Sequence, residues 1–431
     1  MLEMRKMKDS GIEWIGEIPE GWRTINPKAL FTQRKDKAQK GERQLTSSQQ
    51  YGILYQDDYM ELTGSKVVTV EKDFDILKHV EAGDFVISMR SFQGGLEYST
   101  KSGAISSAYV MLVPNLELVY PRFYRWLLKS SVYIDALQRT TNMVRDGQAM
   151  RYSNFAQVRL FALPLDEQKS RADFLDLECS SIDKILFKTR SSIEEYKKLK
   201  QAVITQAVTK GVRGEREMKD SGVDWIGKIP KEWVIQKIKS ISSRINVGVV
   251  IRPSEYFDEN GTVPFLRGIN VKEYLISSDN MVYINESSNR ILSKSQVHTD
   301  DILIVRDGSI GTSCVVPAEF DGANVVSMVI ATPSISCDSR FICYSLNSDV
   351  GKTQFTLTKI GSALTHTSVS AVSDIIVAVP SCAEQKEIAD YLDAKCAEID
   401  RLIAKKEQLV KELESYKKSL IYEVVTGKRE V

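Results

Sequence analysis

Apolar residues recur in alternating steps of four and three along the last fifty residues of the chain. This spacing is a heptad repeat, typical of a helix that packs one narrow face against a partner helix. Ser381 and Glu384 form a capping-box pattern at its start, and Gly427 follows its last turn. The pattern predicts a helix of about 40 residues, roughly 60 Å long. Its predicted seam is Ile388, Leu392, Lys395, Ile399, Leu402, Lys406, Leu409, Leu413, Tyr416 and Leu420.

A weaker seam of the same kind follows Pro164 in the middle of the chain. A long helix with one narrow apolar face requires a partner, so we predict that the two helices pair with each other, antiparallel, within one chain. The alternatives are that each helix packs on its own neighbouring domain, or that the chain dimerises through them. The seam positions are Leu175, Ile182, Ile185, Tyr196, Leu199 and Val203, with Thr189 and Ser192 as polar gaps.

The remaining sequence alternates β-branched runs with short amphipathic stretches. Runs bounded by Gly, Asp and Pro predict strands, and residues 121–133 and 339–350 predict short helices. Both regions are therefore expected to be mixed domains with a sizeable sheet. The predicted strands are 67–72, 83–89, 108–113, 301–308, 324–332 and 374–380.

The chain contains two matched pairs of segments in the same order. MKDSGIEWIGEIPEGW (7–22) and MKDSGVDWIGKIPKEW (218–233), here called the openers, are identical at 11 of 16 positions. EQKSRADFLDLECSSID begins at Glu167 and EQKEIADYLDAKCAEID at Glu384, and Cys179 matches Cys396. The sequences between the matched segments differ. A duplicated framework with different contents is the simplest interpretation.

These observations predict an α+β chain. It has two tandem α/β domains separated by two long helices, which pair as an antiparallel intramolecular coiled coil with pseudo-twofold symmetry. The predicted segments are 1–165, 166–213, 214–380 and 381–431.

Composition excludes several classes of protein. The 431 residues carry a formal net charge of +1, so affinity for a polyanion would have to come from local patches. No stretch reaches 18 apolar residues, no secretory leader is recognisable, and the six cysteines form no C-x-x-C pair, which favours a reduced, cytoplasmic setting. The three histidines cannot build a dense metal cluster.

No catalytic signature is present. The sequence lacks a phosphate-binding G-x-x-x-x-G-K-[ST] loop and the N/D-P-P-Y/F motif of adenine amino-methyltransferases. Glu167-x-Lys169 and Glu384-x-Lys386 match the E-x-K end of a nuclease motif, but a capping role at the helix starts explains both glutamates. Cys179 and Cys396 are expected to be buried near the seam rather than to form a redox pair or bind metal.

The duplicated W-I-G-x-I-P openers, the two divergent middles and the two helices that begin with E-Q-K resemble the specificity subunit of a type I restriction-modification enzyme. The stretch SMRSFQGGLEYS (88–99) also resembles a segment of its target-recognition domains. The resemblance implies a noncatalytic subunit that binds double-stranded DNA and reads a two-part site, one half per variable domain. It also implies two methyltransferase subunits, which restriction subunits can join for translocation and cleavage. S-adenosylmethionine, ATP and Mg²⁺ would then belong to the partner subunits, and none to this chain.

Two readers related by a twofold axis would face half-sites in inverted orientation, about one DNA turn (~34 Å) apart. Because the two middles differ in sequence, the two halves of the site are expected to differ. The tryptophans of the openers are shared between copies, so they are expected to serve the framework or a shared partner rather than base reading.

Base readout requires polar side chains on loops held by a rigid domain. Three stretches qualify in each middle, although a solvated loop is the alternative for each single residue. In the first domain the candidates are Arg43, Gln44, Ser47, Arg90, Ser91, Gln93, Arg145, Gln148, Arg151 and Tyr152. In the second domain they are Arg267, Asn270, Arg306, Ser309, Thr312, Lys359, Ser362, Thr365 and His366.

Two other functions remain possible at the level of sequence. The near-neutral charge also suits a noncatalytic structural adaptor that spaces two protein partners without reading DNA. An enzyme of unknown type is disfavoured by the missing motifs.

Overall fold

The computed structural model describes residues 5–70, 74–89, 91–140, 150–359 and 366–431. The chain divides into two compact units. The first unit is Met1–Arg190 with Gln408–Val431, and the second unit is Ser191–Glu407. Each unit therefore contains one sheet domain and half of each long helix.

The first unit is built on a four-stranded antiparallel sheet. Its order is β4 (Phe31–Arg34), β11 (Val110–Pro114), β8 (Phe85–Ile87) and β9 (Glu97–Tyr98). One face packs on the main core through Phe85, and the other contributes Val86 to a smaller cluster beside the hairpin of β5 (Leu45–Ser48) and β6 (Gly52–Tyr55). The sheet is therefore buried on both faces.

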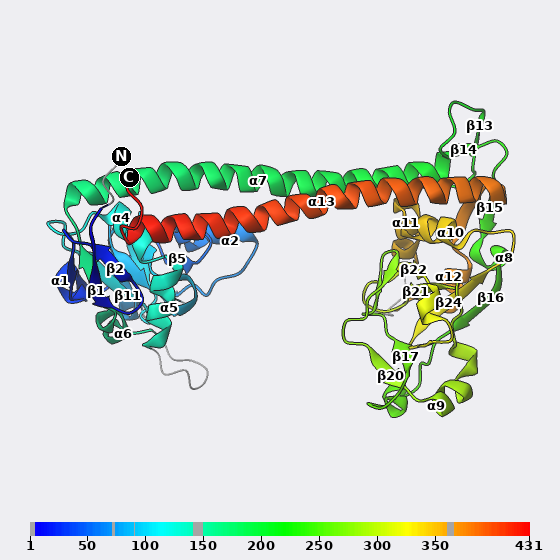
Figure 1. The fold of residues 1–431 in the computed structure, drawn as a ribbon, viewed down its shortest axis with the longest axis horizontal. Helices are drawn as coiled ribbons and strands as arrows, with labels where there is room; N and C mark the ends of the chain where they lie inside the picture. Colours follow the sequence, from blue (N-terminus) through cyan, green and yellow to red (C-terminus); the bar gives the residue numbers. More distant parts are fainter. Residues whose placement is uncertain (1–4, 71–73, 90, 141–149, 360–365) are drawn as a thin grey trace. The chain divides into compact units, whose positions relative to one another are not determined.

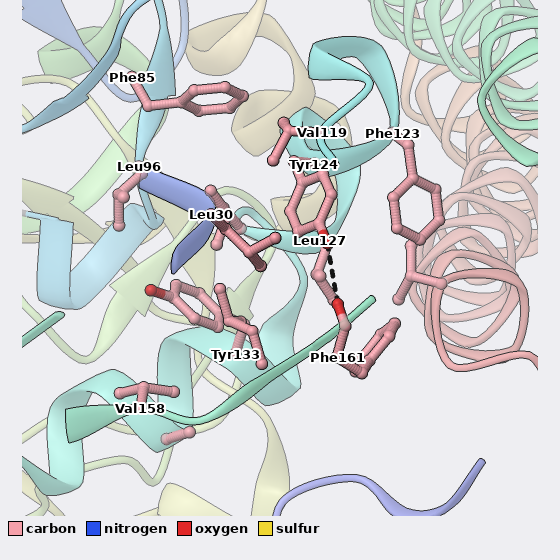
Figure 2. Packing of buried hydrophobic residues seen from close by; sticks show 14 of the residues in the cluster. Leu30, Phe85, Leu96, Val119, Phe123, Tyr124, Leu127, Tyr133, Val158 and Phe161 are labelled. Atoms are coloured by element: carbon pink, nitrogen blue, oxygen red, sulfur yellow. Dashed lines mark hydrogen bonds between the residues drawn. The ribbon is translucent and has the colours of Figure 1, made fainter. Parts of the chain in front are cut away.

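Figure 2 shows the main core of the first unit, where aromatic and aliphatic side chains from several elements meet. Tyr124 lies on α4 (Pro121–Leu127) and donates its hydroxyl to the carbonyl of Phe161 at 2.8 Å. Phe161 lies on β12 (Leu160–Ala162), the strand that leads into the first long helix. This bond satisfies a fully buried hydroxyl and joins α4 to that strand.

The second unit repeats this arrangement. The same strand order is given by β16 (Ser242–Val247), β24 (Met328–Pro333), β21 (Ile302–Val305) and β22 (Ser313–Val315). Both sheets are followed by two short helices: α4 and α5 (Ser131–Arg139) in the first unit, α10 (Ser339–Asn347) and α11 (Asp349–Lys359) in the second. The second unit adds a three-stranded sheet of β20 (Val282–Ile284), β17 (Val263–Leu266) and β23 (Asn324–Val325).

Each opener forms a strand pair, and the strand after it pairs with the strand that precedes a long helix. The opener pairs are β1 (Met7–Ile12) with β2 (Gly16–Pro19), and β13 (Met218–Asp220) with β14 (Lys228–Pro230). The connecting pairs are β3 (Arg23–Ile25) with β12, and β15 (Val234–Lys237) with β25 (Ile376–Val379). The remaining elements are α1 (Pro27–Leu30), α2 (Gln56–Thr63), β7 (Lys78–Val80), α3 (Ser91–Gly94), β10 (Gly103–Ile105), α6 (Tyr152–Gln157), α8 (Ile238–Ile241), β18 (Val271–Lys272), β19 (Leu275–Ile276), α9 (Glu286–Ile291) and α12 (Val369–Ser373).

The long helices are α7 (Leu165–Lys210) and α13 (Cys382–Val425). In the first unit the end of α13 lies beside the start of α7, and in the second unit the start of α13 lies beside the end of α7 (Figure 1). Both halves are therefore antiparallel pairs, as predicted. The pairing is supported by Lys417 to Asp183 in the first unit and by Lys200 to Asp400 in the second, each at 2.6 Å.

The predicted seam is wrong in part. Leu402, Leu409 and Tyr416 are exposed, and so are Ile185 and Leu199 on α7. The heptad spacing is real, but the seam lies one residue further along at several positions. It includes Leu186, Ile193, Ile204 and Ile403 among the buried residues. The prediction placed the seam in the wrong register at these positions, because the predicted register and the one next to it both contain apolar residues.

Five of the six predicted runs contain strands. The exception is 67–72, whose described residues 67–70 form no strand. The run 324–332 forms two strands, β23 and β24, because Ser327 adopts a left-handed backbone (φ 48°) between them.

Candidate nucleic-acid interface

The shared opener tryptophan of the first unit packs on the start of α7. Trp22 is buried, stacks on Phe161 with ring centroids 5.0 Å apart, and donates Nε1–H to a carboxylate oxygen of Glu167 at 3.0 Å. Arg171, one turn along α7, and Arg5 also bind this carboxylate. Hydrogen bonds from these three groups outweigh burial and lower the pKa of Glu167 to about 2.

The second unit has a related set of contacts around Trp233, and we call the two sets the opener clamps. Trp233 is buried beneath the Arg216 guanidinium, 5.3 Å from its ring centroid, and Arg216 pairs with Glu384 at 2.7 Å. The side chain of Glu167 binds Trp22 of the opener and Arg5, and that of Glu384 binds Arg216, so the predicted capping role is wrong for both side chains. Ser381 does accept from the Glu384 amide at 3.4 Å, so half of the capping box is present.

A glutamine next to each glutamate anchors the sheet domain to its helix, and sequence reasoning missed it. Gln168 accepts from the Tyr120 amide at the start of α4 (2.7 Å), and Gln385 accepts from the Asp338 amide at the start of α10 (2.9 Å). The matched E-Q-K motif was the signal that could have identified these residues.

A second missed anchor joins the same short helices to the long ones. Asp176 accepts from Trp126 Nε1 at 2.7 Å and pairs with an arginine of α4, Arg122. Asp393 accepts from the Tyr344 hydroxyl at 2.8 Å and pairs with Arg340 of α10. The repeated R-F and L-D dipeptides carry this contact in the sequence.

The matched cysteines are buried, as predicted. Cys179 is 1% exposed and Cys396 6%, and burial raises the pKa of both thiols, that of Cys179 to about 11. Neither thiol is therefore poised to ionise near neutral pH. Across the described ranges, no three His, Cys, Asp or Glu side chains gather as metal ligands.

In the second domain the structure brings predicted stretches together. The turn between β21 and β22 lies beside residues 366–367, because Arg306 donates Nε–H to the Thr367 carbonyl (2.9 Å) and Asp307 bridges to His366. Ser309 is exposed on this turn. Thr312, half-buried, closes the turn through its carbonyl, which accepts from the Val305 amide at 2.9 Å.

The third predicted stretch of this domain is used mainly for internal support. Asn270 is fully buried and donates to the carbonyls of Ser277 (3.1 Å) and Asp279 (2.9 Å), so its amide is not available to a base. Arg267 is half-buried and binds the carbonyl of Asn280. Polar loop residues that fold back on their own loop cannot be told from readers by sequence.

In the first domain several predicted residues are likewise engaged within the protein. Gln44 forms both amide hydrogen bonds with the Val70 backbone, 2.7 and 2.9 Å, and Ser91 is buried with its hydroxyl accepting from the Ser88 amide at 2.8 Å. Tyr152 donates to the Phe31 carbonyl at 3.3 Å.

Other candidates of the first domain face solvent or are partly covered. Arg43 is exposed, pairs with Asp57 (2.6 Å) and lies over Tyr55. Gln93 and Arg151 are exposed, and Ser47 is half-buried on β5. The candidates Arg90, Arg145, Gln148, Ser362 and Thr365 lie outside the described residues, and Lys359 is described only as the last residue of α11.

None of the helices within the described ranges combines the length and apolar content that crossing a membrane requires.

Comparison with known proteins bears on the fold and the family. Residues 230–413 match the family model of the type I restriction modification DNA specificity domain. The chain is 24% identical over 357 residues to the type I restriction enzyme MjaVIII specificity subunit of Methanocaldococcus jannaschii, covering 81% of this chain and 80% of that protein. It is 23% identical to the EcoKI specificity subunit of Escherichia coli K12 over 47% of this chain and 44% of that one.

Two solved structures share the fold. One is a chain from a study of complex assembly and conformational transition of the type I R-M system, with a TM-score of 0.72 and 13% identity over 96% of this chain and 99% of that one. The other is the HsdS subunit from Thermoanaerobacter tengcongensis, with a TM-score of 0.52 and 14% identity over 96% and 98% of the two chains. These similarities confirm the predicted fold.

Proposed function

We propose that this chain reads a split and asymmetric DNA site. It belongs to the specificity subunits of type I restriction-modification systems, which recognise DNA sequence and are not catalytic. Residues 1–165 and 214–380 are the two recognition domains in this proposal, and residues 166–213 and 381–431 are the spacer helices. Each domain reads one half of the site.

One observation carries this proposal: the two units share a framework and differ in their loops. Both sheets have the same strand order, and both domains are fixed to a long helix by matched Gln and Asp contacts. The turn after the third strand reads SMRSFQGG in the first domain and RDGSIGTS in the second. A shared scaffold with different loops favours two readers of different sequences.

The helix pair sets the distance between the two half-sites in this proposal. Coiled coils are stiff because each seam residue packs into the facing helix, so their length defines a spacing. A fixed gap in the DNA site, near one helical turn between half-site centres, is the expected consequence.

Two methyltransferase subunits are proposed to dock on the shared features, because one kind of partner must bind twice. The openers and the outer faces of α7 and α13 are the shared surfaces. Restriction subunits would join through the methyltransferases. S-adenosylmethionine, ATP and Mg²⁺ are placed on those partners.

Methylome sequencing tests the proposal. The chain is expressed with the methyltransferase encoded beside it in a host that lacks DNA methylation. Methyladenine at an asymmetric two-part motif with a fixed gap is expected, and purified complex should bind that motif with strong salt dependence. A stable complex that methylates no motif would contradict the proposal and favour the adaptor.

Substitution of a loop residue tests which domain reads which half. Arg306→Ala and Ser309→Ala are expected to alter base preference in one half of the motif and leave the other half unchanged. Loss of preference in both halves would contradict the assignment of one half per domain.

A further inference from the structure

The hairpin of β5 and β6 ends in an exposed three-residue loop, Gln49–Gln50–Tyr51. Gln49 and Gln50 end a polar stretch (34–50) predicted to contact DNA, but none of the three residues is among its predicted candidates. Ser48 pairs with Gly52 across the base of this loop, and the Ser48 hydroxyl accepts from the Tyr51 amide at 3.3 Å. Gln50 is exposed, and Tyr51 is 40% exposed with its ring 6.3 Å from that of Tyr59. The loop thus presents an amide and an aromatic ring from a short, closed turn.

A partly buried ion pair between Lys129 and Glu97 supports this loop. Lys129, between α4 and α5, places its Nζ 2.8 Å from both carboxylate oxygens of Glu97 and 3.4 Å from the carbonyl of Gln49. The Glu97 side chain is 6% exposed and lies on β9, the last strand of the sheet. Lys129 therefore connects the sheet to the loop through one ammonium group.

Two adjacent glycines bring the loop and α3 into contact. A Cβ at Gly94 would lie 2.8 Å from Gln49 Cγ, so the side chain of Gln49 packs directly on the glycine. Gly95 has φ +77° and a Cβ there would lie 2.4 Å from the Leu128 carbonyl oxygen. Close internal packing thus explains why glycine occupies positions 94 and 95, and it fixes the position of the loop relative to α3.

We propose that Gln50 and Tyr51 read base edges in the half-site of the first domain, and that Lys129 and Glu97 are the positioning residues of this loop. A glutamine amide can bind adenine through its N6 and N7 atoms, and an exposed tyrosine can contact a neighbouring base or its methyl group. The inference rests on the proposed function and names residues of its first reader.

Comparison with the second unit indicates that the support of a loop by a Lys–Glu ion pair is specific to the first unit. The position that matches Lys129 is Asn347, and the strand position that matches Glu97 is Cys314. Asn347 binds the Ser313 backbone in both directions, at 3.0 and 2.8 Å. The helix end is thus tied to the strand with no ammonium group left to support a loop, so the effects should be confined to one half-site.

The test uses the full chain in complex with its methyltransferase, with the motif obtained from the wild-type methylome. Competition binding against duplexes with single base changes measures discrimination at each position. Gln50→Ala and Tyr51→Ala are each expected to lower discrimination roughly ten-fold at one or two adjacent positions of a single half-site. Gln157→Ala, at an exposed glutamine on α6 of the same domain, is the matched control and should change nothing.

The test of Lys129 needs a measurement that would stay unchanged if Lys129 only stabilised the fold. Lys129→Gln is expected to lower discrimination at the same positions as Gln50→Ala, and Lys129→Arg to retain it. If Lys129→Gln lowers only the thermal stability and leaves base preference intact, the positioning role is overturned.

Two failures are distinguishable. If the wild-type complex yields no two-part motif, the proposed function itself fails. If the motif is present but Gln50→Ala and Tyr51→Ala preserve discrimination at every position, the loop is not a reader and this inference alone fails.

Discussion

The two units use different chemistry to join the end of a short helix to the neighbouring strand. In the first unit the joint is the charged pair of Lys129 and Glu97; in the second, a neutral amide, Asn347, binds the backbone of Ser313. Burial raises the pKa of the Glu97 carboxyl even beside Lys129, so the first joint is electrostatically costly and the second is not. A costly group at a position where a neutral one suffices is a reason to look for function there.

The opener clamps of the two units also differ in the charge of one matched residue on the long helix. In the first unit Arg171 is buried on α7, and its guanidinium also donates to the carbonyls of Val424 (2.8 Å) and Arg429 (2.9 Å). The matching residue of the second unit is Ile388, which is fully buried and apolar. Arg171 therefore secures the end of α13 as well as the opener, whereas Ile388 at the same position of the second unit contributes an apolar contact. Duplication has preserved the positions of these contacts rather than their chemistry.

Removal of the Lys129 ammonium group from its ion pair with Glu97 should have the largest effect on stability. Lys129→Met leaves Glu97 buried without its cation and is expected to destabilise the first unit by about 3 kcal/mol, at the low end for such pairs because Lys129 is partly exposed. Hydrogen exchange, read separately on peptides of each unit, is the suitable measurement, since a chain with two units need not unfold in one step.

Two controls sharpen this comparison. Adding Glu97→Gln to Lys129→Met should recover much of the loss, because no buried charge then remains, and the loss from Lys129→Met alone should shrink in acid as Glu97 takes up a proton. Lys40→Met, at an exposed lysine of the same domain, should be neutral. Equal losses in both units would contradict the assignment.

Acid should weaken the first unit through Glu167. Its pKa is about 2 in the folded chain and about 4.5 ordinarily, so the folded state binds the proton less tightly. This stabilisation is fully present above pH 4.5 and is lost as the pH falls toward 2. We expect about 2 kcal/mol, after an allowance for partial exposure. Stability measured against pH should lose this step in Glu167→Gln; an unchanged profile would exclude Glu167 as its origin.

Much of the fold follows from the sequence because its signals are local and repeated. The heptad spacing predicts both helices, and the matched openers predict a duplicated framework. Seam register was harder, since Leu402 and Ile403 are both apolar and only the facing helix decides which is buried.

The candidate site was less predictable. A polar residue such as Gln44 or Asn270 looks the same in sequence whether it binds DNA or its own backbone, because its partners are brought near only by folding. The framework glutamate Glu167 was assigned to a cap because Trp22 lies 145 residues away in the chain.

The tryptophan clamps offer a smaller and more direct comparison. Trp22→Phe and Trp233→Phe both remove part of a buried indole, but only Trp22 donates to a carboxylate; Trp233 Nε1 has no hydrogen-bond partner among the described residues. We expect Trp22→Phe to cost about 1.5 kcal/mol more in its unit than Trp233→Phe in its own, the value of a hydrogen bond to a charged group. Equal costs would indicate that the clamps depend on packing alone.

The smallest expected effects concern the helix pair, where the two units are most alike. Lys417 with Asp183 and Lys200 with Asp400 are the same contact seen from each copy, since the lysines and the aspartates are both 217 positions apart. Partly exposed ion pairs contribute about 0.2–1 kcal/mol, so Lys417→Gln and Lys200→Gln should each cost less than about 1 kcal/mol, and by similar amounts in their respective units. The exchanged pair Asp183→Lys with Lys417→Asp should restore stability if the contact is electrostatic, and high salt should reduce all of these differences. A loss in the exchanged pair as large as that of the single variants would instead show that the lysine stems, packed against the seam, carry the contact.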